Sequence, residues 1–168
     1  MKKIFLIVSF IFLGQTKVVM AAPKIGSKEF FSKLTAQSMN LVDEFYDSKI
    51  VFQDPINELR GSAQVKDYYS HLYKNVDYIK FDFEKQLVSG NEEVLFWVMH
   101  LRAKGLNSGK EIAVSGNSHI VYSTESGKCI YHRDYFDMGE FIYEQVPVLK
   151  NVISFVKNRL KAQDKQEK

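Results

Sequence analysis

The side chains best suited to acid–base chemistry lie in the segment His132-Arg133-Asp134. His132 and Asp134 are two residues apart in a predicted strand, so both are expected on one face of that strand, together with Ile130. An imidazole beside a carboxylate can take up a proton or activate a water molecule. The same two residues can also form a structural hydrogen-bonded pair, and both interpretations stay open on the sequence alone.

A third candidate for proton transfer is Asp54, which follows a short apolar run and precedes Pro55. A carboxylate at a strand end, close to apolar walls, has a raised proton affinity and can shuttle a proton. The alternative is an Asx turn, in which the carboxylate accepts hydrogen bonds from the backbone amides of Ile56 or Asn57. The candidate catalytic side chains are therefore Asp54, His132 and Asp134.

The sequence carries no motif for a cofactor or a metal ion. Its single cysteine, Cys129, has no CxxC step or Cys/His cluster around it, and no glycine-rich phosphate loop is present. We therefore expect no cofactor and no metal site. Cys129 also has no neighbouring base in the sequence, so we assign it no nucleophilic role.

The composition of the 168 residues fits one soluble domain with a real core, since 45% are hydrophobic and 14% are aromatic. The formal net charge of +3 depends on residues 1–22, which hold three lysines and no acid. The rest of the chain has 20 basic and 20 acidic residues. A neutral domain has no broad attraction for phosphate backbones, which argues against a nucleic-acid partner.

The first 22 residues have the pattern of a secretory signal peptide. Two lysines precede the apolar run Ile4–Leu13, and Val19-Met20-Ala21 offers a cleavage step. The alternative is a retained membrane helix, but the run is shorter than the roughly 20 residues that span a bilayer. We expect a cleaved signal peptide at 1–22, a folded domain at 23–161 and a polar tail at 162–168. The mature protein is then periplasmic or secreted.

Hydrophobic periodicity predicts helices first and an antiparallel meander afterwards. Ser27 and Asn40 are expected to cap the first two helices, and Gly61-Ser62 begins a third whose apolar residues recur at helical spacing. From Ile79 the period switches to two, and glycine-containing turns separate the strands. The predicted helices are 27–38, 40–46, one beginning at 61–62, and one beginning at Pro147; the predicted strands are 50–52, 79–84, 94–102, 112–122 and 128–135. Helices segregated from an antiparallel sheet make the fold class α+β.

This element order resembles the SnoaL-like branch of the nuclear transport factor 2-like superfamily. The segments that carry the resemblance are Phe45-Tyr46, Phe52-Gln53-Asp54-Pro55, Gly61, Gly116-Asn117-Ser118-His119 and Gly127-Lys128 with the following His132-Arg133-Asp134-Tyr135-Phe136-Asp137. The resemblance implies a cone-shaped α+β barrel, in which a curved sheet wraps three N-terminal helices around a deep apolar pocket. A C-terminal helix follows. The superfamily includes isomerases, hydrolases, cyclases and non-catalytic binding modules, so the fold alone does not assign an activity.

Two enzyme families within this superfamily are similar to parts of the chain. Ketosteroid isomerases have their general-base aspartate in an Asp-Pro step like that of Asp54, but the tyrosine and protonated aspartate that stabilise their oxyanion have no evident match. Limonene-epoxide hydrolases have a segment similar to residues 132–137, whose first aspartate matches Asp134. Trp97 and Met99 stand where those hydrolases have an Arg-x-Asp step, so the known catalytic set is incomplete.

The resemblance also implies which side chains meet a ligand. Six side chains are expected to line the pocket beside the polar candidates: Tyr46, Phe52, Trp97, Met99, Val114 and Ser118. The expected function is binding of a small apolar, lipid-, steroid- or polyketide-like molecule. The alternative is an isomerase or hydrolase that uses Asp54 and the His132/Asp134 pair.

Two surfaces suggest further contacts. The opposite face of the sheet, with Tyr131, Arg133, Tyr135, Phe96, Val98, His100 and His119, is expected to pair two copies into a homodimer, or to be a partly solvated face. The closing helix has an apolar stripe that includes Leu149, Val152 and Val156. We interpret the stripe as packing against the cone rather than lying on a membrane surface, because such stripes usually face a core.

Overall fold

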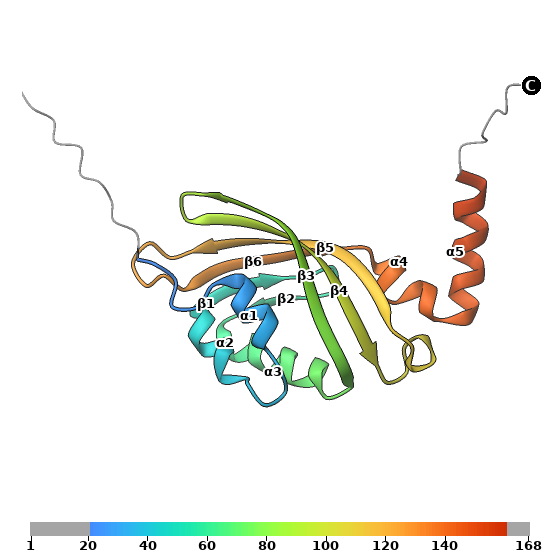
Figure 1. Cartoon of the computed structure of the whole chain (residues 1–168), viewed down its shortest axis with the longest axis horizontal. Coiled ribbons are helices and arrows are strands. Elements are labelled where there is room, and N and C mark those ends of the chain that lie inside the picture. The colour runs from blue at the N-terminus through green and yellow to red at the C-terminus, as the bar shows by residue number, and fades with distance from the viewer. Residues whose placement is uncertain (1–20, 161–168) are drawn as a thin grey trace, which may run out of the picture.

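A six-stranded curved sheet wraps around three short helices in the computed structural model, which describes residues 21–160 (Figure 1). The strand order is β2-β1-β6-β5-β4-β3. The elements are, in chain order, α1 Ser27–Lys33, α2 Asn40–Phe45, β1 Tyr46–Gln53, β2 Glu58–Arg60, α3 Ser62–Tyr73, β3 Val76–Ser89, β4 Glu92–Ala103, the 3-10 turn η1 Asn107–Gly109, β5 Ile112–Tyr122, β6 Cys129–Phe136, α4 Met138–Phe141, the 3-10 turn η2 Tyr143–Gln145 and α5 Pro147–Leu160. The α+β cone and its C-terminal helix are confirmed.

The strands β3 to β6 form the predicted antiparallel meander. The turn between β3 and β4 contains Gly90, whose φ of 60° suits a residue without a Cβ. β3 is longer than the predicted strand at 79–84. Its pairing with β4 shifts between Phe83 and Lys85, and the residues beyond this bulge are exposed. Alternating burial therefore stops at the bulge although the backbone pairing with β4 continues.

β1 lies between β2 and β6 in the sheet and runs further than the predicted strand at 50–52. It pairs in parallel with β6, placing Phe52 opposite His132, and antiparallel with the short β2. β2 was not predicted, since three residues with one apolar side chain give no readable alternation. The parallel pairing joins the first and last strands and so brings their side chains to one place.

The helices begin close to the predicted positions but use different caps. Gly26 is the N-cap of α1, and Ser27, the predicted cap, is buried at the first helical position without a side-chain cap bond. The predicted cap Asn40 is likewise the first residue of α2, after the N-cap Met39. α3 begins after Gly61 as predicted, and the φ of 86° at this glycine explains the residue type.

The core between the helices and the sheet is mainly aromatic. Phe30 of α1 stacks on Phe45 with ring centroids 4.3 Å apart and meets the ring of Tyr46 edge-on at 5.3 Å. All three side chains are buried. Burying one such ring contributes about 1.5–3 kcal/mol, so packing of these rings, more than helix propensity, stabilises such short helices.

The outward face of the sheet is partly solvated. Its seven predicted residues are half-buried or exposed: Phe96, Val98, His100, His119, Tyr131, Arg133 and Tyr135. Ile130 was predicted to share the inner face with His132, but it is exposed, because the pairing of β5 with β6 shifts beside it. The homodimer through this face stays a prediction.

The prediction that α5 packs against the cone is wrong. α5 stands away from the sheet and contacts the body through η2 at its base (Figure 1). Its apolar side chains are mostly exposed: Val148, Leu149, Val152, Phe155, Val156 and Leu160. Among the described residues no helix is long and apolar enough to cross a membrane. The predicted signal peptide, apart from Ala21 and Ala22, and the predicted tail lie outside the described residues.

Candidate functional site

An apolar cavity of about 70 Å³, open to solvent at its mouth, lies between the helices and the concave face of the sheet. Its lining is Phe31, Leu34, Phe52, Asp54, Tyr68, Tyr69, Leu72, Tyr73, Ile79, Phe81, Trp97, Met99, Asp134, Phe136 and Phe141. Asp54 and Asp134 are the two carboxylates of this lining. An apolar cavity with few polar groups is typical of a small-molecule site.

Asp134 is held in place from the neighbouring strand. Ser118 of β5 lies directly opposite Asp134 of β6 and donates a 2.5 Å hydrogen bond to its Oδ1. The indole Nε1 of Trp97 donates to the Ser118 Oγ at 2.9 Å. Because an indole N–H can only donate, it orients the Ser118 hydroxyl toward the carboxylate.

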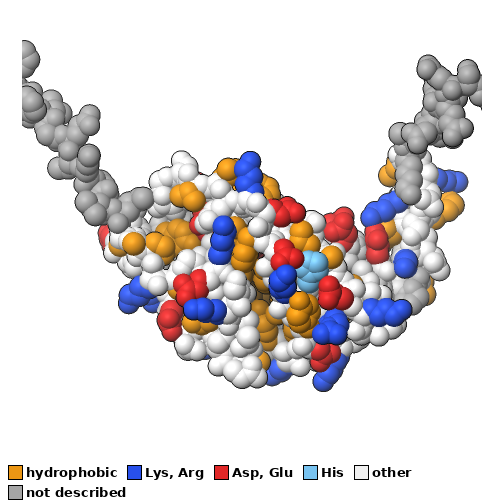
Figure 2. Space-filling view, viewed as in Figure 1, with side chains coloured by type: hydrophobic (Ala, Val, Ile, Leu, Met, Phe, Trp, Pro, Cys, Tyr) orange, Lys and Arg blue, Asp and Glu red, His pale blue; other side chains and the backbone are white. Residues whose placement is uncertain are grey.

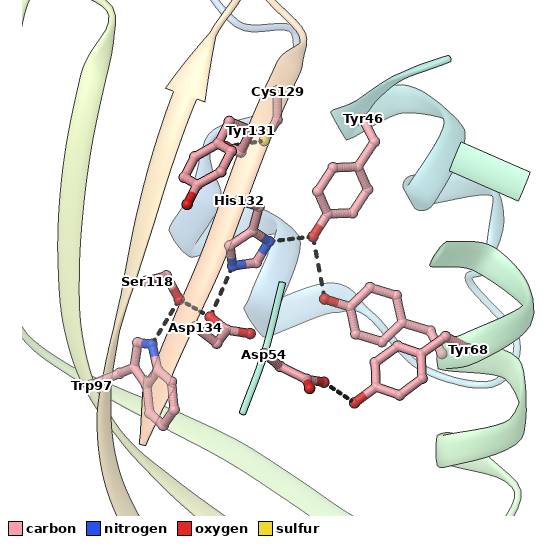
Figure 3. Close-up of polar contacts among 10 residues, drawn as sticks. Tyr46, Asp54, Tyr68, Trp97, Ser118, Cys129, Tyr131, His132 and Asp134 are labelled. Atoms are coloured by element: carbon pink, nitrogen blue, oxygen red, sulfur yellow. Dashed lines mark hydrogen bonds and ion pairs between the residues drawn. The ribbon is translucent and has the colours of Figure 1, made fainter. Parts of the chain in front are cut away.

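His132 holds the same carboxylate oxygen from the other side (Figure 3). Its Nε2 lies 2.9 Å from the Asp134 Oδ1, and its Nδ1 lies 2.6 Å from the hydroxyl of Tyr46. That hydroxyl lies 3.2 Å from the hydroxyl of Tyr69. The imidazole is fully buried and both of its nitrogens are occupied, so it positions Asp134 and does not face the cavity.

Tyr46 and Tyr69 keep their protons. Burial raises the pKa of Tyr46 and of Tyr69 well above the usual tyrosine value. The Tyr46 hydroxyl can then donate to Nδ1 of His132, which leaves Nε2–H to donate to Asp134. With this order, each hydrogen bond from the Tyr69 hydroxyl to the Trp97 indole has one donor and one acceptor.

Asp54 forms the Asx turn that was the alternative to a role in proton transfer. Its Oδ1 accepts hydrogen bonds from the backbone amides of Ile56 and Asn57 at 2.7 and 2.6 Å. Its Oδ2 accepts one from the Tyr68 hydroxyl at 2.7 Å and one from the Asn57 side chain at 3.2 Å. Asp54 lines the cavity, but donors of the protein already surround its carboxylate.

The structure brings the three candidate catalytic residues together in two layers. Asp54 and Asp134 line the cavity, and His132 lies behind Asp134. Of the six predicted ligand contacts, Phe52, Trp97 and Met99 line the cavity. The other three do not: Tyr46 and Ser118 hold the polar chain, and Val114 belongs to a separate apolar cluster with Leu101.

Sequence analysis missed the contribution of α3. Tyr68 and Tyr69 both line the cavity, and each brings a hydroxyl to a polar group of the site. Their helical spacing marked them as apolar core, and only their position in space gives the hydroxyls a role. Phe141 of α4 was also missed; it packs edge-on against Phe136 at the cavity.

The polar chain predicts an asymmetry between two buried tyrosines. We expect Tyr46→Phe to lower the free energy of unfolding by about 1–3 kcal/mol, because His132 Nδ1 and the Tyr69 hydroxyl lose their shared partner. Tyr73→Phe is the matched control, since its hydroxyl has no hydrogen bond within residues 21–160 and it too is largely buried. Urea unfolding measures both variants, and equal losses would contradict the role of Tyr46.

A family model described as a SnoaL-like domain matches residues 28–132, more than half of the chain. The match runs from the second residue of α1 through β5 to the first half of β6. Among curated proteins, none matches the chain.

Solved structures share the fold at low sequence identity. A protein provisionally assigned as a SnoaL-like polyketide cyclase from Shewanella denitrificans OS-217 has a TM-score of 0.61 at 19% identity, covering 71% of this chain and 92% of its own. An LEH-like epoxide hydrolase from M. tuberculosis has a TM-score of 0.57 at 15% identity, with 77% and 90% covered. An NTF2-like protein of unknown function from Burkholderia pseudomallei K96243 has a TM-score of 0.56 at 14% identity, with 63% and 83% covered. At these identities the likeness shows the fold alone.

Proposed function

The chain belongs to the SnoaL-like domain family, and from that premise we propose that it binds a small, mainly apolar molecule in the cavity. The molecule carries a hydroxyl group, or an equivalent donor, that hydrogen-bonds to Asp134. The aromatic lining supplies most of the contact area, and the carboxylate fixes the orientation. Lipid-, steroid- and polyketide-like molecules all meet this description.

One observation carries the proposal, and it concerns the two oxygens of Asp134. Oδ1 accepts hydrogen bonds from Ser118 and His132, whereas within residues 21–160 no donor of the protein reaches Oδ2. The side chain is only 14% exposed and lines the cavity. A carboxylate oxygen left open in an apolar cavity is costly unless a ligand or water donates to it.

A second candidate function is proton transfer, as in an isomerase or hydrolase. The same oxygen could take a proton from a carbon acid or from a water molecule, with Ser118 and His132 holding the carboxylate in position. Asp54 fits this role less well, because four groups of the protein already donate to it.

The proposal also concerns where binding occurs. Since residues 1–22 have the pattern of a signal peptide, we place the binding event in the periplasm or outside the cell. A ligand in such a compartment would reach the cavity without crossing into the cytoplasm.

A matched pair of probes tests the binding proposal. 2-Naphthol should bind at least about tenfold more tightly than naphthalene, because a hydrogen bond to a charged group contributes about 1.5–3 kcal/mol. Calorimetry measures both affinities, and the emission of Trp97, the single tryptophan, reports whether the probe enters this cavity. Equal affinities, or binding that leaves the Trp97 emission unchanged, would contradict the proposal.

A further inference from the structure

We propose that α5 lies on the surface of an anionic lipid membrane, with its apolar face in the lipid. The inference is independent of the cavity and of any ligand in it. It starts from the exposed apolar side chains of α5, which the fold leaves without a partner.

The apolar side chains of α5 form one continuous face. At 100° per residue they occupy a roughly 160° arc, and lysine, asparagine and serine occupy the opposite side. Most of this arc is exposed: Val148 is 73% exposed, Phe155 59% and Leu160 79%. Apolar side chains can be seen on the outer edge of α5, next to cationic ones (Figure 2).

The charges of α5 fit an anionic surface. Residues 147–160 contain Lys150, Lys157 and Arg159 and no acidic residue. Lys157 is paired with Glu144 of η2, whereas among the described residues no carboxylate pairs with Lys150 or Arg159. The guanidinium of Arg159 lies over the Phe155 ring at 4.6 Å, so this cation stands within the apolar face. An arginine there can reach lipid phosphates while its stem stays among the acyl chains.

A second copy of the chain fits this face less well. A helix of 14 residues is about 21 Å long, and one of its faces is small against the about 800 Å² that each partner of a stable interface buries. Pairing two such faces would also bring Arg159 of each copy into an apolar interface. A lipid surface accepts the same arginine at its headgroup level.

The arrangement of α5 also permits contact with a plane. It packs against the body mainly through η2 at its base, and the helix stands clear of the curved sheet (Figure 1). The salt bridge between Lys157 and Glu144 is a further contact between α5 and η2. An amphipathic helix with these features has the character of an interfacial helix.

Vesicle sedimentation tests the proposal on the chain from Pro23 to Lys168, which retains every described helix and strand. We expect binding to vesicles of phosphatidylcholine with phosphatidylglycerol, and much weaker binding to phosphatidylcholine alone. Raising NaCl from about 0.1 M to about 1 M shortens the Debye length from about 10 Å to about 3 Å and should release the protein.

Variants separate the apolar face from the charges. Val152→Gln with Phe155→Gln should weaken vesicle binding at least about tenfold, because two exposed apolar side chains no longer enter the lipid. Lys150→Gln should weaken binding to the anionic vesicles roughly fivefold. Asn151→Gln with Asn158→Gln, on the polar side, is the matched control and should bind as the unchanged chain does.

Two results would overturn the proposal. The first is that the V152Q/F155Q variant sediments with anionic vesicles as the unchanged chain does, while its Trp97 emission shows that the sheet is folded. The other is a dimer by light scattering that this variant converts to a monomer, which would identify a second copy as the occupant. Neither result depends on naphthol binding, so the cavity proposal is tested separately.

Discussion

Asp134→Asn should abolish most of the hydroxyl-dependent affinity while the fold stays intact. The hydrogens of Ser118 and His132 both point at Oδ1, so the amide oxygen of asparagine takes that position. The amide nitrogen then replaces Oδ2 and presents a donor to the cavity, where the ligand also brings a donor. We expect 2-naphthol to lose about tenfold to about a hundredfold in affinity and naphthalene to lose little.

The same variant separates the two candidate functions. If Asp134 accepts a proton from a substrate, turnover should fall by about 10²–10⁴-fold with affinity nearly unchanged, since the loss is confined to the transition state. Asp67→Asn is the matched control, because Asp67 is exposed on α3 and does not line the cavity. If Asp134→Asn bound 2-naphthol and turned over substrate like the unchanged chain, Asp134 would be neither the hydrogen-bond acceptor for the ligand nor the base. That result would contradict both candidate functions.

Gly116→Ala should destabilise the protein and block the cavity. A Cβ at this position would lie 2.3 Å from Cη2 of the Trp97 indole, well inside van der Waals contact. The indole cannot easily yield, because its Nε1 donates to Ser118 and its ring meets Phe81 edge-on at 5.5 Å. We expect a loss of about 1–3 kcal/mol in the free energy of unfolding, typical of overpacking.

Ligand binding should fall together with stability in this variant. Any shift of the indole disturbs the cavity wall and removes the donor that orients Ser118, and with it one support of Asp134. Ser115→Ala is the control on the same strand, since Ser115 is exposed on the other face of the sheet. Urea unfolding and Trp97 emission measure both variants; identical curves would show that the indole adapts at no cost.

Much of the fold could be predicted because its signals are local. Alternation in β3 to β5, and glycines such as Gly90 and Gly61 at positive φ, mark strands, turns and a helix start in short windows. Reliance on local signals also explains one error: the predicted first helix runs to residue 38, whereas α1 ends at Lys33. Its stripe continues in the sequence, but Ser38 folds back and donates to the carbonyl of Lys33, forming a local turn.

The site could be predicted only in part, because its parts meet through distant pairings. Alternation alone indicated that His132 and Asp134 share a face. The contact between Tyr46 and His132 depends on the parallel pairing of β1 with β6, for which no short pattern exists. The stripe of α5 likewise indicates an amphipathic helix without indicating what lies against it.

The parallel pairing of β1 with β6 has a consequence for how the protein folds. The hairpins of the meander join neighbouring segments, whereas Tyr46 and His132 are separated by 86 positions in the chain. Closing so long a loop costs conformational entropy. This cost is offset only by the contacts that exist once most of the sheet has formed. The cavity wall from β3 and β4 can therefore form early, and Ser118 reaches Asp134 through the local hairpin of β5 with β6. The contact of Tyr46 with His132 forms only when β6 docks beside β1. The Tyr46 hydroxyl therefore fixes the His132 imidazole, and through it one side of Asp134, only at the last step of sheet assembly.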